Sequence, residues 1–317
     1  YEITDEKNTG HLQAVKNWSG ITDTEKYSYP GIQFKLYRQY VSNDKEQNTE
    51  TVISGTDSIL VTKAELVDTK KLDSGKDASG TVTFDTSKLR IHAPNGTKYY
   101  YYIEETLLHG YSYDATENNT VPQKSPVFLL EAGKTAESPQ KISFENTYQP
   151  DKEKVILTGT KVWDDYSNSL GIRPTGETFK NQIKVLRYAD AQNLAGGGQA
   201  IAEEEILVQS RDANAPNYIE WTETDTATWT YTIHNLEKYA PNTMPWKYVV
   251  KESAVSGYKA SPADTDPANV NGGRVDSKDG TLTDNEDIAL PDLITMPPMT
   301  NSSRKSAAIQ KTWTDAD

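Results

Sequence analysis

The chain has 317 residues, contains no cysteine and carries a formal net charge of −13 at pH 7. This length exceeds that of one ordinary domain and favours two. The acidic charge argues against nucleic acid as a partner, because phosphate binding needs clustered Lys and Arg. No run of 18 apolar residues occurs, so we expect no membrane contact, and the lack of cysteine excludes disulfide bonds.

Short stretches in which apolar and polar residues alternate recur along the chain and predict β-strands. In chain order, the clearest are residues 31–37, 81–84, 142–147, 182–188 and 228–233. Residues 61–71 are the best candidate for a helix, as a short loop helix. Clusters of Gly, Pro and Asn separate the strands. The pattern predicts an all-β protein made of two tandem antiparallel β-sandwich (Ig-like) domains.

A Lys-x-Trp motif occurs three times and sets a domain-sized period. Its lysines are Lys16, Lys161 and Lys311, which are 145 and 150 positions apart. We therefore divide the chain into a first unit at 1–150, a second at 151–303, and a linker with the first strand of a truncated third repeat at 304–317. We expect the sequence to be a segment of a longer protein.

Two further markers recur in phase with this motif. Glu105 and Glu252 each lie four residues after a Tyr and five before a Gly-Tyr pair, 89 and 91 positions after the Lys of the Lys-x-Trp motif in their unit. Asn146 and Asn301 then stand at the end of each unit. Alone, each residue has an ordinary interpretation, namely a solvated Lys, a surface Glu and a turn-forming Asn. Their recurrence in the same order favours a shared role.

The three residue types can form a covalent bond if the fold buries them together. Burial favours the neutral form of a Lys amine, which is then a nucleophile, and an Asn carboxamide offers a carbon for attack. A nearby Glu in an apolar site would have a raised pKa, could polarise the Asn carbonyl and could carry protons to the departing ammonia. The product is an amide between two side chains, formed once after folding.

The second unit resembles the Cna protein B-type repeats of Gram-positive surface adhesins and pilins. The resemblance lies in residues 159–165, Arg173-Pro174, 229–239 and 248–258. The first unit keeps Lys-x-Trp, Glu and Asn but lacks the Asp-Asp and Arg-Pro elements. The resemblance implies β-sandwich domains with an intramolecular isopeptide bond in each, made by a catalytic Glu. The residues implied are Lys16, Glu105 and Asn146 in the first unit, and Lys161, Glu252 and Asn301 in the second.

Some alternatives to this assignment stay open. Glu104 neighbours Glu105, and Asn285 is a rival to Asn301, which follows two prolines that restrict strand pairing to an edge or a bulge. The acidic stretch 264–292 offers carboxylates for calcium, although it lacks EF-hand spacing and reads better as a solvated loop. The tyrosines at 99–102 alternate, which favours two in the core over a sugar-binding strip.

The resemblance also implies a role. We expect a monomeric structural stalk of a wall-anchored adhesin, extracellular on a Gram-positive bacterium, with no cofactor and no metal. A host extracellular ligand would bind other parts of the parent protein. Rival hypotheses are that these domains bind the host ligand themselves, that the chain is a pilin subunit, and that it is a carbohydrate-processing enzyme. We expect no enzymatic activity beyond the single-turnover formation of its own cross-links.

Overall fold

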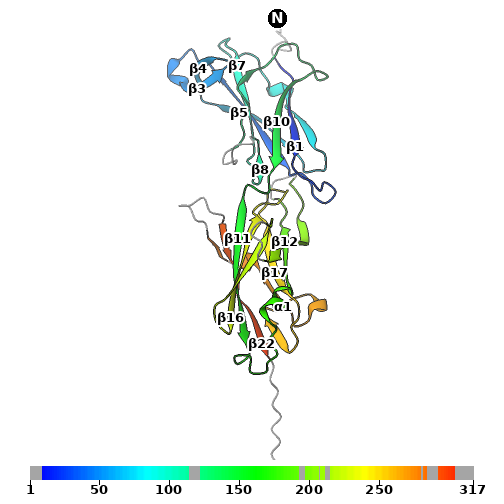
Figure 1. The fold of residues 1–317 in the computed structure, drawn as a ribbon. Helices are drawn as coiled ribbons and strands as arrows, with labels where there is room; N and C mark the ends of the chain where they lie inside the picture. Colours follow the sequence, from blue (N-terminus) through cyan, green and yellow to red (C-terminus); the bar gives the residue numbers. More distant parts are fainter. Residues whose placement is uncertain are drawn as a thin grey trace, which may run out of the picture. The chain divides into compact units, whose positions relative to one another are not determined.

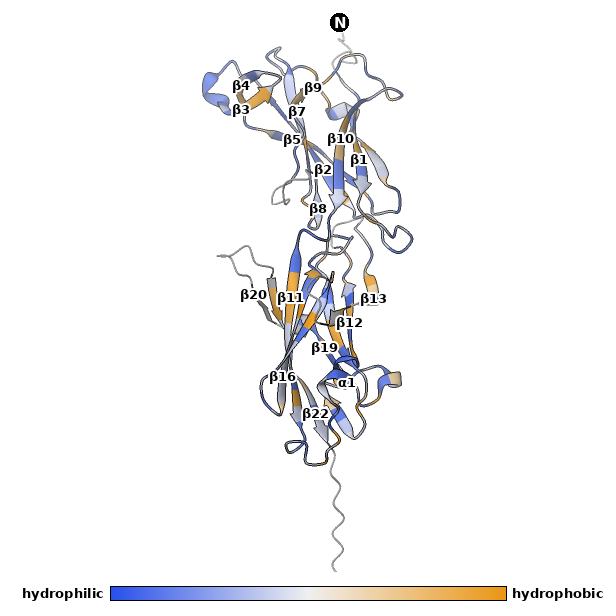
Figure 2. Ribbon diagram, viewed as in Figure 1, coloured by the Kyte–Doolittle hydropathy of each residue, from blue (hydrophilic) through white to orange (hydrophobic). Residues whose placement is uncertain are grey.

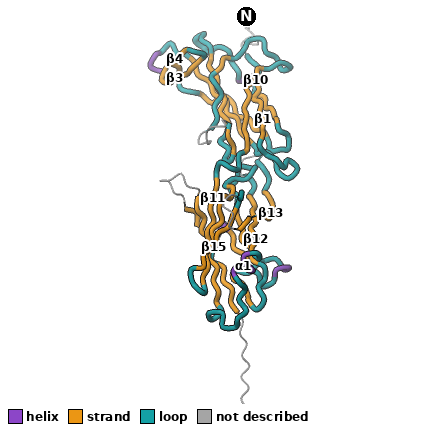
Figure 3. Tube along the Cα trace, in the orientation of Figure 1, coloured by secondary structure: helices purple, strands orange, loops and turns teal. Residues whose placement is uncertain are grey.

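The structure is a computed structural model that describes residues 9–113, 122–192, 197–206, 208–210, 215–279, 281–283 and 292–303. It divides into two compact units. The first comprises Tyr1–Glu153, Ala189–Ile201 and Lys238–Pro245, and the second comprises Lys154–Tyr188, Ala202–Glu237 and Trp246–Asp317. Strands dominate both units (Figure 3). The structure confirms the predicted all-β class with two sandwich-like domains. The predicted linker and third-repeat strand at 304–317, with Lys311, lie outside the described residues. So do Asn285 and, within the acidic stretch, residues 280 and 284–291.

The first unit consists of two four-stranded sheets and a separate hairpin (Figure 1). One sheet has the order β6 (Ser79–Thr83), β1 (Leu12–Ser19), β10 (Gln140–Tyr148) and β8 (Tyr111–Ser112). The other has the order β5 (Glu65–Leu72), β2 (Ile32–Tyr40), β7 (Tyr99–Glu105) and β9 (Phe128–Leu129). The hairpin pairs β3 (Asn48–Ser54) with β4 (Asp57–Thr62), and short 3-10 turns occupy Lys45–Gln47 and Thr86–Lys88.

Side-chain alternation explains how these sheets pack. Every second residue of β1 is buried, and Phe34 of β2 contacts Phe144 of β10 with ring centroids 5.3 Å apart. In β7, Tyr99 and Tyr101 are buried and the tyrosines between and after them are half-buried, as alternation predicted. The two inner faces therefore form one core, which is the arrangement of a β-sandwich.

The second unit also has two main sheets. One contains β14 (Gln209–Ser210), β15 (Tyr218–Glu223), β16 (Thr228–Glu237), β11 (Lys154–Asp164), β21 (Asp292–Thr295) and β20 (Thr281–Thr283), with β22 (Met299–Ser303) and β18 (Tyr258–Ser261) attached to β11. The other has the order β13 (Ile201–Ile206), β12 (Ile183–Ala189), β17 (Lys247–Glu252) and β19 (Gly273–Asp276). Helix α1 (Gly176–Lys180) and 3-10 turns at Pro267–Asn269 and Ser277–Asp279 complete it.

The first strand of each unit pairs in parallel with the last. β1 pairs with β10 along its whole length. β11 pairs first with β21 and then with β22, and Pro297 and Pro298 lie in the gap between those two strands, where the missing N–H groups leave no ladder bond unmade. Hydrophobic and hydrophilic residues are interspersed along the strands (Figure 2), as expected for sheets with one face in a core.

The prediction of a helix at 61–71 is wrong. Residues 57–62 and 65–72 form β4 and β5, and Val61 is fully buried. β5 pairs with β2 from Glu65 to Leu72, so its backbone groups find partners in a neighbouring strand. Pairing with distant residues has overridden a weak local preference for helix.

Candidate functional site: two buried clusters of lysine, glutamate and asparagine

The second unit buries Lys161, Glu252 and Asn301 at one place between its two sheets. Lys161 lies on the core-facing row of β11, Glu252 is the last residue of β17 in the opposite sheet, and Asn301 is the middle residue of β22. Their exposed fractions are 1%, 0% and 0%. A polar trio placed this deep needs internal partners, because leaving its groups unpaired costs several kcal/mol.

A single carboxylate supplies those partners. Lys161 Nζ lies 2.6 Å from Glu252 Oε2, and Asn301 Nδ2 donates to Glu252 Oε1 at 2.5 Å. The rings of Trp163 and Phe179 face the amine, with their centroids 5.0 and 5.3 Å from Nζ. Glu252 therefore contacts both the Lys161 amine and the Asn301 amide, beside two aromatic rings.

Strand register brings the lysine and the asparagine to the same face. In the parallel pairing of β11 with β22, Lys161 lies opposite Met299 and Trp163 opposite Asn301. Asn301 is thus two positions beyond the residue that faces Lys161. Because side chains alternate with a period of two, that offset places Lys161 and Asn301 on the core side of neighbouring strands.

The first unit repeats this geometry. Lys16 Nζ lies 2.8 Å from Glu105 Oε2, and Asn146 also hydrogen-bonds Glu105. Lys16 of β1 lies opposite Phe144 of β10, so Asn146 is again two positions beyond the residue facing the lysine. The exposed fractions of the three residues are 0–2%. All six residues singled out in the sequence therefore lie in two matching clusters.

Burial shifts the protonation equilibria of these groups. It lowers the pKa of Lys16 and of Lys161 from 10.5 to about 8, although the neighbouring carboxylates oppose the shift. Burial also raises the pKa of Glu105, with Lys16 opposing. Both directions favour the uncharged forms, and a neutral amine is the nucleophilic form. In the first cluster, burial thus shifts both the Lys16 amine and the Glu105 carboxyl toward their uncharged forms.

The asparagine carbonyls are the incompletely satisfied part of the clusters. Within the described residues, Oδ1 of Asn146 and Oδ1 of Asn301 are buried and accept no hydrogen bond. Half a turn of either amide group would exchange its nitrogen and oxygen with little change of shape. A protonated Glu could then donate to the oxygen, which polarises the carbonyl for attack.

Glu104 and Glu105 have distinct surroundings. Glu104 is half-buried and pairs with Lys124 at 3.4 Å, whereas Glu105 points into the core and contacts Lys16. This follows from the alternating burial of β7, in which Tyr99, Tyr101 and Glu105 belong to the inner row. Glu105 is therefore the glutamate that reaches the first cluster.

A second buried ionic group lies beside Trp163, and the sequence pattern alone did not indicate it. Asp165, which is 2% exposed, accepts from Arg173 Nε at 2.8 Å and Nη2 at 2.5 Å, and from Tyr258 Oη at 2.8 Å. The Tyr258 ring packs on Trp163 with a centroid distance of 5.2 Å. The Asp-Asp, Arg-Pro and Gly-Tyr elements in the sequence carried the signal, but their meeting depends on the fold. We call Asp165, Arg173 and Tyr258 the aspartate clamp.

The aspartate clamp should make the second unit sensitive to acid. The Arg173 hydrogen bonds, against the opposing effect of burial, lower the pKa of Asp165 from 3.8 to about 2. A lowered pKa contributes stability that is complete above the unfolded-state value and is lost as pH falls through the folded-state value. Urea unfolding should show a wild-type advantage over Asp165→Asn of about 2 kcal/mol at pH 6, shrinking between about pH 4 and pH 2. An advantage that does not change with pH would contradict this account.

Three other features bear on alternative sites. No group of three or more His, Cys, Asp or Glu in the described ranges could hold a metal ion. The described start of the acidic stretch is engaged in ion pairs, since Lys251 Nζ lies 2.9 Å from Asp264 and 3.6 Å from Asp266. Among the described residues, no helix has the length and apolar character needed to span a membrane.

Comparison with known proteins places part of the chain in a family. Residues 157–272 match the Cna protein B-type domain, and no curated protein matches the chain. Similar solved structures include the major pilin protein T-13 of Streptococcus pyogenes (12% identity, 94% of this chain and 98% of that one, TM-score 0.33) and a shaft pilin of Lactobacillus rhamnosus GG (13%, 94% and 100%, 0.32). Another is a B repeat unit of the collagen binding surface protein of Staphylococcus aureus (16%, 94% and 100%, 0.20).

The match covers the strands that carry Lys161 and Glu252, together with the aspartate clamp. It stops before Asn301 and leaves out the first unit. The family match is therefore confined to the second unit, whose residues 157–272 match the Cna protein B-type domain.

Proposed function

We propose that each unit closes itself with an isopeptide bond, between Lys16 and Asn146 in the first and between Lys161 and Asn301 in the second. One observation carries the proposal. In both units a single buried Glu carboxylate contacts the Lys amine and the Asn amide at the same time. Groups held this close react with a high effective concentration.

The proposed reaction balances without any cofactor. Nζ of the neutral Lys attacks Cγ of Asn, and a C–N bond forms as the bond from Cγ to Nδ2 breaks. The amine loses one proton, which the Glu carboxyl receives and passes to the departing nitrogen, so that ammonia leaves. Glu105 or Glu252 ends in its starting state, which makes it a general acid and base in a single-turnover reaction.

The position of the bond gives it a mechanical meaning. Each cross-link would join the first strand of a unit to the last, which already lie side by side in one sheet. Tension that enters by one terminus would leave by the other through covalent bonds. A cysteine-free chain would thus have a staple that reduction does not open. The proposed biological role is a structural stalk of a Gram-positive cell-surface adhesin or pilus, and the Cna protein B-type match supports it.

Intact mass of the denatured chain tests the proposal directly. Each bond removes one ammonia, so the wild type should weigh about 34 Da less than its sequence, at about 17 Da for each bond. Glu105→Ala and Glu252→Ala should each restore one loss, and the double variant should have the full mass. Tandem mass spectrometry should then find the linked peptides. A full-mass wild type would refute the proposal for both units, and a deficit of about 17 Da would refute it for one.

A second candidate function is ligand binding by the first unit, and one observation favours it. Ile53 and Leu60 are 70% and 51% exposed and lie on the same face of the β3–β4 hairpin, where Ile53 borders a cavity of about 610 Å³. Contiguous exposed apolar patches often mark contact surfaces, and a binding patch on this hairpin would be centred on these two side chains. Binding of the chain to immobilised host matrix proteins should be lost in an Ile53→Ser, Leu60→Ser variant. Equal binding by that variant would exclude the hairpin.

A further inference from the structure

We propose that Asn269 is a positioning residue that fixes Glu252 for cross-linking in the second unit. The inference rests on the proposed function, since it concerns how the catalytic Glu is held. Asn269 ends the 3-10 turn at Pro267–Asn269, in the acidic stretch of the sequence, and does not contact the reacting atoms. It acts on the backbone that carries Glu252.

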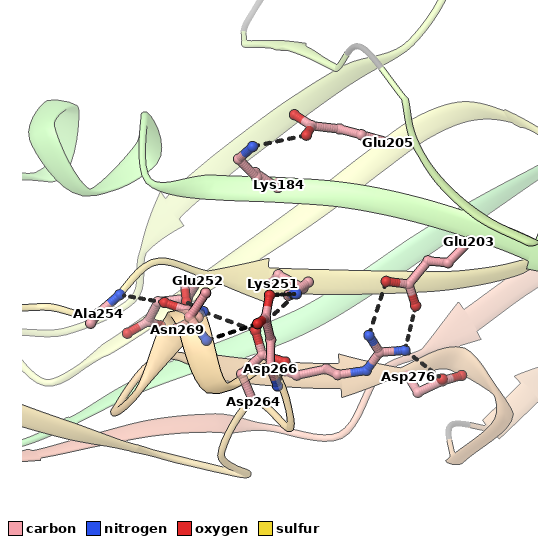
Figure 4. A network of polar contacts seen from close by, with 12 residues as sticks. Lys184, Glu203, Glu205, Lys251, Glu252, Ala254, Asp264, Asp266, Asn269 and Asp276 are labelled. Atoms are coloured by element: carbon pink, nitrogen blue, oxygen red, sulfur yellow. Dashed lines mark hydrogen bonds and ion pairs between the residues drawn. The ribbon is translucent and has the colours of Figure 1, made fainter.

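Asn269 binds the chain on both sides of the Glu252 side chain. Its Nδ2 donates to the backbone oxygen of Glu252 at 2.8 Å, and its Oδ1 accepts from the backbone N–H of Ala254 at 3.0 Å. Glu252 is the last residue of β17, so the ladder ends where the carboxyl group must be held. Figure 4 shows this two-sided contact. The Asn269 side chain thereby supplies hydrogen bonds to the backbone where the pairing of β17 with its neighbouring strands ends.

Asn269 is itself held by a buried ion pair. Its Nδ2 also donates to Asp264 Oδ2 at 2.9 Å, and Lys251 Nζ lies 2.9 Å from the same oxygen (Figure 4). The Asp264 side chain is fully buried. A buried carboxylate with two donors has a fixed position, and it fixes the orientation of the Asn269 amide. Asp264, at the start of the acidic stretch, therefore has two structural partners, Lys251 and Asn269.

Two adjacent glycines make room for this arrangement. A Cβ on Gly272 would collide with the Asn269 side chain. A Cβ on Gly273, which pairs with Glu252 in β19, would lie 2.6 Å from Sδ of Met299, the residue opposite Lys161. Gly272 thus leaves space for the Asn269 side chain, and Gly273 leaves space for Met299 of β22, the strand that carries Asn301.

The first unit holds its glutamate by a different device. There the backbone N–H of Glu105 donates to the oxygen of Gln123 at 2.9 Å, and that of Thr106 to Gln33 at 3.0 Å. Changes at Asn269 should therefore leave the first cluster untouched. The chain carries its own control, since both reactions can be followed in one molecule.

The test is the rate of ammonia loss after refolding. Full-length chain recovered from inclusion bodies in denaturant is diluted into refolding buffer and quenched in acid at intervals, and peptide mapping reports each cross-link separately. In Asn269→Ala, the Lys161–Asn301 bond should form at least about tenfold more slowly, because small misplacements of reacting groups cost large factors in rate. The Lys16–Asn146 bond should form at the wild-type rate. Equal rates for the Lys161–Asn301 bond would overturn the proposal.

A charge-swapped variant separates loop stability from positioning. In Asn269→Asp combined with Asp264→Asn, residue 264 can donate to residue 269 and the N–H of Ala254 keeps its acceptor, but the oxygen of Glu252 loses its donor. This variant should also cross-link slowly although its loop is braced. Glu205→Gln, which breaks only the exposed 2.8 Å pair with Lys184 on the same face, should react like the wild type. A swapped variant at the wild-type rate would show that the Glu252 contact is unnecessary.

The pH profile provides a readout that folding alone would not move. Asn269 and Glu252 border one cavity of about 350 Å³, and removing the Asn269 side chain should enlarge it beside Glu252 and admit more water there. Better hydration would return the Lys161 amine toward its usual pKa, and the rising limb of the rate should move to higher pH. If Asn269→Ala lowered the rate of bond formation equally at every pH, with no shift of the curve along the pH axis, the positioning role would be overturned. If the wild type lost no ammonia, the proposed function itself would have failed.

Discussion

Replacing Lys161 with Met should lower the melting temperature of the second unit by about 10–20 °C. The lost bond would have closed a loop of 140 positions, from Lys161 to Asn301, worth about 5 kcal/mol in the chain-entropy treatment of cross-links. One kcal/mol moves the midpoint of a domain of this size by about 2–4 °C. Met keeps the length and the apolar stem of Lys, so loss of packing should add little. Scanning calorimetry measures the shift.

Two comparisons isolate the covalent contribution. Glu252→Gln removes the proposed catalyst but keeps the shape of its side chain, and should lower the same transition by a similar amount. The transition of the first unit should stay in place in both variants and serves as an internal reference. A shift below about 3 °C, which corresponds to only about 1 kcal/mol in a domain of this size, would contradict a cross-link in the second unit.

Pulling on the two termini should reveal the cross-links even more clearly. In the wild type, the 130 positions from Lys16 to Asn146 and the 140 from Lys161 to Asn301 are bridged and cannot extend. Glu105→Gln should release the first of these segments, which adds about 450 Å of contour length at ~3.5 Å per residue. Single-molecule force spectroscopy of the full chain records such steps.

The matched variant provides the control for this measurement. Glu252→Gln should release the second segment instead, about 490 Å by the same estimate, and the double variant should show both steps. Glu104→Gln, next to the proposed catalyst but outside the core, should remain inextensible like the wild type. Wild-type molecules that extend by either length before rupture would contradict the closed-loop topology.

The sequence contained enough information to predict the clusters because they lie on regular strands. Lys16 and Lys161 occupy inner positions of alternating segments, and an inward Lys is conspicuous against apolar neighbours. Glu and Asn recur at similar distances after each of these lysines, and this repetition predicted which residues would be their partners. The shared carboxylate and the two-residue offset between Lys and Asn depended on pairing between distant strands, which alternation alone does not specify.

Loops and long-range contacts account for what the sequence analysis missed. Asn269 looked like one polar residue among many in an acidic stretch, and its importance comes from the end of a strand 17 positions earlier. Asp165 and Tyr258 are 93 positions apart. The helix predicted at 61–71 failed for the same reason, since β2 supplies partners that a local pattern does not contain. Local periodicity predicts strands well and predicts their partners poorly.

The parallel pairing of first and last strands also orders events in time. Residues 299–303 reach β11 only after the rest of the second unit has been synthesised, because they close that unit's sheet. A chain emerging from its N-terminus would therefore present Lys161 and Glu252 long before any asparagine could meet them. Until then the second unit has no covalent cross-link, so its chain can still pass through a narrow channel in an extended form. Bond formation would then serve as a chemical record that the final strand has arrived and the unit is complete.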